Sequence, residues 1–189
     1  MREGEMSTKE KIIQVSLELF ANQGYHKTSI NQIARAIGVS KSLIYNYFES
    51  KDQLLLHIIE DFMERNMAKL PGGSIQNLNS VDDLIDYLRV IKEDAKSQPA
   101  YYRLLIMLTL QGTVKDKLMA DILEKQQKLL PQIHAFFEKN HVPNPQIATY
   151  VFGAILDGII LHFLYMEEKY PIDEVFEFYA SRLQSFLKS

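Results

Sequence analysis

The sequence predicts an all-α protein with about nine helices. Apolar residues recur at helical spacing from end to end, no segment shows the alternation of a strand, and capping residues precede most of the helical runs. Apolar residues make up 47% and charged residues 24% of the 189 residues, as in ordinary soluble globular proteins. We therefore expect a helical chain long enough for one medium domain or two small ones.

Three short helices are predicted near the N-terminus. The first covers about residues 8–22, where Ser7 and Glu10 form a capping-box pair. The second covers about 29–36 and is capped at Thr28 or Ser29, with Gln32 as box partner. The third covers about 41–47, after a glycine-containing link that ends in the capping residue Ser40. Residues 1–51 are predicted to form a three-helix domain.

Longer helices follow and form the predicted body, residues 52–189. A fourth helix begins at Ser50 and runs to about residue 69, and the sequence Pro-Gly-Gly-Ser at 71–74 separates it from a fifth helix that begins at Ser80. The remaining helices are predicted over about 99–111, 113–140, 145–168 and 171–187.

Charge is distributed unevenly between the two predicted parts. Residues 1–51 hold seven Lys and Arg against five acidic residues, a net charge of +2, whereas the rest of the chain carries −5 and the whole chain −3. A basic segment attached to an acidic body favours contact with phosphate at the N-terminal end.

A short helix, a turn with glycine and a second short helix are typical of a helix-turn-helix, whose second helix lies in the major groove of DNA. The third predicted helix offers side chains that can bind phosphate or base edges, while Thr28 and Lys51 stand at helix starts, which attract phosphate. The predicted DNA-binding residues are Thr28, Ser29, Ser40, Lys41, Ser42, Leu43, Tyr45, Asn46, Tyr47 and Lys51. The alternative is that the two tyrosines are partly buried, amphipathic core residues and that Lys41 is only solvated.

A long motif within about 50 residues consists of Gly24-Tyr25, Thr28-Ser29, Ile33-Ala34, Gly38-Val39-Ser40, Leu43-Ile44-Tyr45, Tyr47-Phe48, Ser50-Lys51 and Leu54. This motif resembles the N-terminal domain of TetR-family transcriptional regulators. It implies an all-α homodimer of nine-helix protomers with a ligand-responsive body. It also implies phosphate contacts from Thr28, Ser40, Tyr45 and Lys51. Ser42 and Tyr47 depart from the glycine and histidine frequent in the family.

The apolar composition and the residue spacing of the C-terminal helices predict a dimer. Residues 147–166 are almost wholly apolar, and Ile172, Phe176, Tyr179, Leu183 and Phe186 recur at heptad spacing. Two such helices from each of two chains would form a four-helix bundle. The predicted interface is Ala154, Gly158, His162, Ile172, Phe176, Tyr179, Leu183 and Phe186. The alternatives are that both helices serve the core of one monomer, or that 147–166 spans a bilayer, against which the mid-segment Asp157 argues.

Aromatic and methionine residues in the body suggest a pocket for an apolar or amphipathic effector, although such residues also fill ordinary cores. The candidate pocket residues are Phe62, Tyr101, Tyr102, Arg103, Met107, His134, Phe137, Tyr150, Asp157 and His162. The resulting hypothesis is a cytoplasmic, effector-released repressor that binds a near-palindromic operator as a homodimer. The alternative is a sequence-specific DNA-binding protein without an effector.

An enzyme is not expected. The chain has no cysteine, no HExxH motif and no glycine-rich phosphate loop. His57 and Asp61 have ligand spacing on a helix, but two ligands do not make a metal site. We therefore predict no catalytic residues, no metal site and no cofactor.

Overall fold

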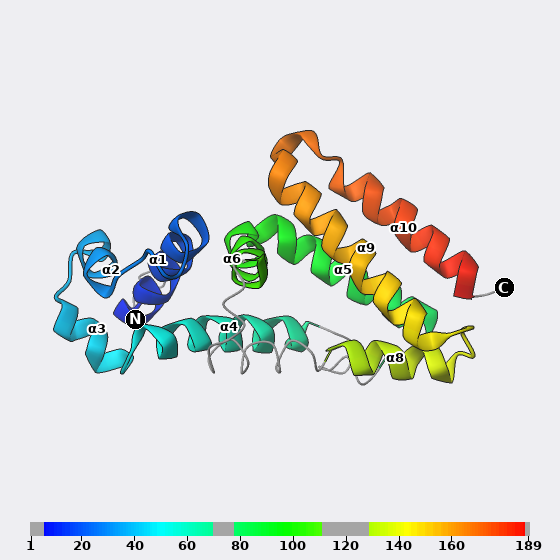
Figure 1. The fold of residues 1–189 in the computed structure, drawn as a ribbon, viewed down its shortest axis with the longest axis horizontal. Helices are drawn as coiled ribbons and strands as arrows, with labels where there is room; N and C mark the ends of the chain where they lie inside the picture. Colours follow the sequence, from blue (N-terminus) through cyan, green and yellow to red (C-terminus); the bar gives the residue numbers. More distant parts are fainter. Residues whose placement is uncertain (1–5, 70–77, 111–128, 188–189) are drawn as a thin grey trace. The chain divides into compact units, whose positions relative to one another are not determined.

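The computed structural model describes residues 6–69, 78–110 and 129–187. Within these ranges it contains nine α-helices and no strand, which confirms the predicted all-α fold (Figure 1). The contacts divide the chain into two compact units. The first holds residues up to 62 together with the segment that begins at Ala100, and the second holds 63–99 and the C-terminal helices.

The first unit is built on α1 (Thr8–Gln23), α2 (Ile30–Ile37), α3 (Lys41–Tyr47), the first part of α4 (Lys51–Ala68) and most of α6 (Pro99–Leu110). The predicted capping boxes at Ser7 and Ser29 are present, with both reciprocal hydrogen bonds. The unit extends beyond the predicted boundary at residue 51, because α4 and α6 contribute to its core. Its fully buried side chains include Ile12, Phe20, Ile33, Ile44, Leu54, Leu55, Ile59 and Leu104.

The second unit contains α5 (Val81–Ser97), α8 (Leu129–Lys139), α9 (Pro145–Met166), a short 3-10 turn (Glu167–Lys169) and α10 (Ile172–Leu187). Helix α10 packs on α5 and α9, and α8 packs on α9 (Figure 1). Its core includes Leu84, Leu88, Ile133, Phe136, Phe137, Phe152 and Phe176. Of the helix predicted over 113–140, residues 113–128 lie outside the described ranges.

Helix α9 is not buried on all faces in the single chain, although its composition predicts that it would be. Thr149, Phe152, Leu156, Ile159 and Ile160 face the core of the unit. The other face is open and mostly apolar: Ile147, Tyr150, Val151, Ile155, Leu161, Tyr165 and Met166 are exposed, together with the polar Asp157 and His162. By length and composition alone, Pro145–Lys169 could also cross a bilayer.

Candidate nucleic-acid interface

The turn between α2 and α3 depends on a glycine. Gly38 has φ +73° and ψ +31°, a left-handed conformation that a Cβ atom disfavours, and its N–H donates to the carbonyls of Ala34 and Arg35. The Val39 N–H also donates to the Ala34 carbonyl, at 3.0 Å. The chain therefore leaves α2 and, after two residues, reaches the cap of the next helix.

Ser40 then begins α3. Its hydroxyl oxygen accepts a hydrogen bond from the Leu43 N–H at 3.1 Å and lies 2.9 Å from the hydroxyl of Ser42. The cap satisfies one of the N–H groups that a helix start leaves free. Ser40 is exposed, so the start of α3 is accessible to a phosphate.

Helix α3 has one buried face and one open face. Ile44 is fully buried, and Phe48, which ends the helix, is nearly so. The two tyrosines are 42% exposed at position 45 and 43% exposed at position 47. Both tyrosines are therefore partly buried and partly exposed on the surface of the unit. The open face consists of Lys41, Ser42, Tyr45, Asn46 and Tyr47, and Leu43 is half-buried beside it.

The open face carries hydrogen-bonding groups that suit DNA. The Lys41 ammonium lies 5.5 Å from the centre of the Tyr45 ring, so positive charge and an aromatic hydroxyl are presented together. Lysine, serine and tyrosine can bind phosphate, and asparagine can pair with adenine through two hydrogen bonds. Each of these side chains is available without unfolding any part of the unit.

Two residues predicted to contact phosphate point elsewhere. Thr28 is only 1% exposed, and its hydroxyl donates to the Gly24 carbonyl at 2.9 Å. The Lys51 ammonium donates to the carbonyls of Tyr25 and Thr28, both at 3.0 Å. Both side chains are therefore used inside the protein, whereas Ser29 is exposed at the start of α2 and caps it.

Sequence reasoning missed the role of Tyr25 and Asp52. The Tyr25 hydroxyl donates to the Asp52 carboxylate, and the Tyr25 ring packs edge-on against Phe20. An aromatic residue directly after a helix-ending glycine was the available sign of a packed turn.

The candidate effector residues are divided between the two units. Five of them lie in the first unit, where the Phe62 and Tyr101 rings stack and Arg103 donates to the Asn22 side chain at 3.2 Å. The other five lie in the second unit. There Phe137 is buried, while Tyr150 and His162 are exposed on α9. Tyr102, Met107 and His134 are half-buried.

The Asp157 carboxyl is also exposed, yet the surrounding protein displaces enough water to raise its pKa. The Nδ1 atom of His162 lies 2.8 Å from the carbonyl oxygen of Gly158, one turn earlier in the helix. Among the residues of the described ranges, no three His, Asp or Glu side chains lie close enough to hold a metal ion.

The second unit carries an open groove of about 410 Å³. Of the predicted pocket residues only Phe137 lines it. Its wall is almost entirely apolar and is formed by Phe137, Pro143, Asn144, Ile147, Ala148, Val151, Phe152, Ile155, Tyr179, Arg182, Leu183 and Phe186. The groove runs into the exposed face of α9 through Ile147, Val151 and Ile155.

The predicted dimer seam divides between two environments. Ile172, Phe176 and Leu183 are buried within the protomer, so their side chains are not available to a partner. Tyr179 is half-buried in the groove wall. Ala154, His162 and Phe186 are exposed and Gly158 is half-buried. The heptad spacing on α10 thus marks the face that packs on α5 and α9 of the same chain.

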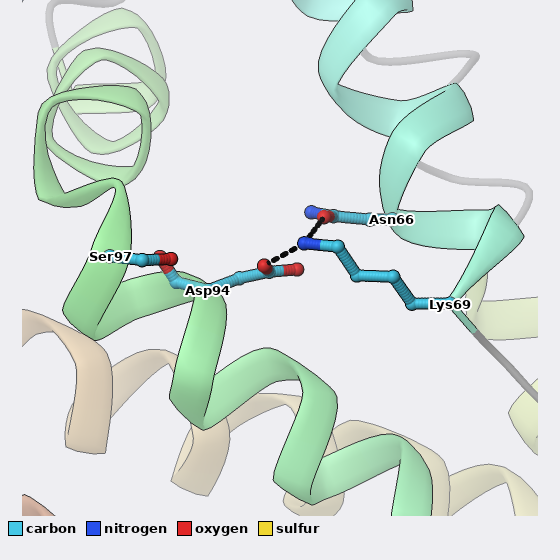
Figure 2. Close-up of polar contacts among 4 residues, drawn as sticks. All are labelled: Asn66, Lys69, Asp94 and Ser97. Atoms are coloured by element: carbon cyan, nitrogen blue, oxygen red, sulfur yellow. Dashed lines mark hydrogen bonds and ion pairs between the residues drawn. The ribbon is translucent and has the colours of Figure 1, made fainter.

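A buried carboxylate joins the end of α4 to α5 within the second unit. Figure 2 shows Lys69 between Asn66 and Asp94, with its ammonium directed at the Asp94 carboxylate. Asp94 is only 3% exposed, whereas the Lys69 side chain is half-exposed. The pair therefore fastens the last turn of α4 to the second unit.

Comparisons with known proteins agree with this geometry. Residues 12–58 match the family model for bacterial regulatory proteins of the tetR family. Over 66 residues the chain is 39% identical to the uncharacterized HTH-type transcriptional regulator YuxN of Bacillus subtilis, a match that covers 34% of this chain and 23% of that protein. It is 29% identical over 116 residues to the HTH-type transcriptional regulator RutR of Escherichia coli, covering 60% of this chain and 54% of RutR.

These matches cover less than two thirds of either relative, whereas a solved structure matches along nearly the whole chain. The fatty acid degradation regulator FadR from Bacillus halodurans superposes with a TM-score of 0.75 at 18% identity and covers 96% of both chains. At this identity the likeness concerns the fold alone.

The turn, the cap and the open face of α3 define a helix-turn-helix DNA-binding protein. Its N-terminal domain belongs to the TetR family of bacterial regulatory proteins.

Proposed function

We infer that the chain is a cytoplasmic transcriptional regulator that binds a near-palindromic DNA operator as a homodimer. The open face of α3 carries this proposal, because Lys41, Tyr45 and Asn46 are exposed together on a helix whose other face is locked into the core. A major groove admits such a helix, and its base edges offer acceptors and donors to these groups. The likeness of residues 12–58 to the TetR family supports the same conclusion.

The homodimer is supported by the open apolar face of α9. A contiguous apolar face that is exposed on a soluble protein marks an interaction surface. A two-fold interface uses the same surface on both partners. The exposed residues on α9, with Phe178 and Phe186 on α10, supply such a surface. Two reading helices would then lie about 34–36 Å apart, one turn of duplex DNA. Sedimentation as a monomer at micromolar concentration would remove this part of the proposal.

An apolar or amphipathic effector would bind preferentially to an arrangement of the body in which the distance between the two reading helices does not match one turn of duplex DNA. The protein would then be released from the operator. The support is the aromatic content of the body and the structural likeness to a regulator named for fatty acid degradation. Repression is the proposed output.

Selection from a randomised DNA pool at physiological salt tests the proposal, since phosphate binding alone is weak there. Enrichment of a two-fold-symmetric motif is expected. Lys41→Ala and Tyr45→Ala should each weaken binding to that motif by about tenfold. Lys11→Ala is the matched control, because Lys11 is an exposed lysine of the same unit on α1. Binding with no enriched motif would overturn the proposal.

The effector is tested separately with the enriched duplex as probe. Medium- and long-chain fatty acids are expected to weaken the complex and to raise the melting temperature of the free protein. If a broad screen of apolar compounds changes neither quantity, the protein is a DNA-binding protein without an effector.

A further inference from the structure

The open face of α9 has a hollow near the start of the helix and a projecting side chain near its end. The apolar groove of the second unit, about 410 Å³ in volume, is lined at the start of α9 by Ile147 and Val151. Tyr165 stands near the other end and is 84% exposed, more than any other large hydrophobic residue that the structure describes. A two-fold interface uses one surface twice, so a second copy of the chain can bring this projection to this hollow.

Gly158 lies on the same face, and its own chain does not require the missing side chain. In the part of the chain that the structure describes, a Cβ atom built on Gly158 meets no atom within 4 Å beyond its own stretch of helix backbone. Glycine inside a helix is less favourable than alanine, so its presence here has no benefit within the protomer. With Ala154 one turn earlier it forms a flat strip on which a second helix can approach closely.

Two copies of α9 that cross at this strip fit each other in an antiparallel register. A two-fold axis at the level of Leu156, midway between Ala154 and Gly158, sets the two small residues opposite each other. Tyr165 lies nine residues after Leu156 and Ile147 nine residues before it, so both are about 14 Å from the axis along the helix. Tyr165 of each chain therefore reaches the groove of the other chain at Ile147.

The charges at the two ends of the face agree with this register. Glu167 and Glu168 are exposed in the turn that follows α9, eleven and twelve residues after Leu156. The register places them opposite the start of the second copy's α9, where Asn144 lines the groove and its side chain makes no capping hydrogen bond. A helix start attracts negative charge, and Arg182 adds a full positive charge to the same groove. An antiparallel pair therefore brings acidic groups to a positive end, which a parallel pair does not.

We propose that Tyr165 of one chain fills the groove of the second copy, and that Ala154 faces Gly158 where the two α9 helices cross. The inference rests on the proposed homodimer and adds the register of the two helices and the residue that anchors them. An aromatic side chain that enters an apolar pocket of the partner is the kind of contact that supplies most of the binding energy of an interface. Symmetry makes this contact twice in each dimer.

The register is tested by cross-linking, because the chain contains no cysteine of its own. The variant combines Ile147→Cys with Tyr165→Cys in the full chain. These positions are about 27 Å apart along one helix, and a disulfide needs Cα atoms within about 7 Å, so the bond cannot close within a chain. Oxidation with diamide should give a covalent dimer on a non-reducing gel. Ile147→Cys alone and Tyr165→Cys alone are the matched controls and should give none.

The anchor is tested by complementation. Tyr165→Ala removes the projection and Ile147→Trp fills the hollow, so each variant alone should associate at least about tenfold more weakly than the wild type in sedimentation. Mixing the two variants should restore a dimer with one chain of each kind. In that dimer the intact tyrosine meets an open groove, and the truncated side chain meets the filled one. Tyr47→Ala is the control, because Tyr47 is an exposed tyrosine of the first unit, and its association should equal that of the wild type.

Three results would overturn the inference. They are a covalent dimer from either single-cysteine variant, no covalent dimer from the double variant, and unchanged association of Tyr165→Ala. Gly158→Leu gives a further check, since the protomer has room for the side chain. It should keep the helical circular-dichroism spectrum and sediment as a monomer, and a dimeric Gly158→Leu protein would also overturn the inference.

Sedimentation of the wild-type chain separates this inference from the proposed function. A monomeric wild type would remove the homodimer itself. A dimeric wild type that gives no cross-link between positions 147 and 165 would keep the homodimer and remove only the register and the tyrosine anchor.

Discussion

The hydroxyl group of Thr28 has a hydrogen-bond partner inside the protein. A threonine at a helix start suggests a phosphate ligand, because a helix N-terminus attracts anions. In the structure the side chain is turned inward and its hydroxyl donates to the Gly24 carbonyl. The exposed Ser29 is the actual cap of α2. Sequence spacing could not decide which of two adjacent hydroxyls faces solvent.

Thr28→Val should therefore destabilise the protein without affecting phosphate binding. Valine fills the same volume but removes a buried donor, which costs about 1–2 kcal/mol of unfolding free energy. Urea unfolding measures the change, and the salt slope of DNA binding should equal that of the wild type. Thr28→Ser, which keeps the hydroxyl, is the matched control, and its unfolding free energy should fall by less than that of Thr28→Val. A variant as stable as the wild type would show that the internal hydrogen bond contributes nothing.

Asp83 gives a prediction for acid pH. Its carboxylate accepts hydrogen bonds from the N–H groups of Asn79 and Ser80, at 2.9 and 2.8 Å, in the capping box of α5. These bonds, with one from the Ser80 side chain, lower the pKa of Asp83 below its ordinary value of 3.8. Above pH 3.8 the charged carboxylate of Asp83 therefore stabilises the folded state. This stabilisation is lost as the pH falls below 3.8 and through the lower pKa that Asp83 has in the folded protein.

Asp83→Asn should remove this part of the pH dependence. Urea midpoints measured from pH 7 down to about pH 3 should fall less steeply for the variant than for the wild type. Glu10→Gln is the parallel case on α1, since hydrogen bonds from Ser7 lower the pKa of Glu10. The prediction would be contradicted if the urea midpoints of Asp83→Asn and of the wild type fell equally steeply with decreasing pH.

At the scale of elements, the ends of helices were the most predictable feature. The bounds of α3 were predicted correctly, and those of α1 and α2 within a residue, because each start has a capping side chain and Gly24 and Gly38 end the first two. The environment of a helix face was less predictable. The heptad spacing on α10 resembled a dimer seam, but Ile172, Phe176 and Leu183 are buried in the same chain. Periodicity identifies an apolar face and does not identify its partner.

An ion pair joins the end of α4 to α5 within the second unit. Lys69 is half-exposed, and the Asp94 carboxylate that it meets is buried (Figure 2). Lys69→Met would leave that charge without its ammonium partner, and we expect a loss of about 1–3 kcal/mol, reduced from fully buried pairs by solvent around the lysine. Chemical denaturation measures it.

The charge itself can be tested with a second variant. Lys69→Met combined with Asp94→Asn should recover part of the loss, because an amide does not carry an uncompensated charge. Full stability in Lys69→Met alone would mean that water replaces the ammonium at no cost.

At the scale of the whole molecule, the open face of α9 is expected to hold two chains together. Ile155 lies on this face and lines the apolar groove. Ile155→Glu would place a charge in a dry interface, so the variant should sediment as a monomer at micromolar concentration and lose operator affinity by at least about a hundredfold. Asp86→Lys on the exposed side of α5 is the control and should stay dimeric. A dimeric Ile155→Glu protein would place the interface elsewhere.

The two tyrosines on the open face of α3 have an optical consequence. The chain contains ten tyrosines and no tryptophan, so tyrosine alone produces its ultraviolet fluorescence. Tyr45 and Tyr47 emit from the surface that would meet the bases, while Tyr25, Tyr87 and Tyr101 are enclosed by protein. Occupation of the reading helix should therefore quench a fixed share of the emission, and Tyr45→Phe or Tyr47→Phe should each reduce that share. The protein carries its own signal for DNA binding, with no dye or label attached.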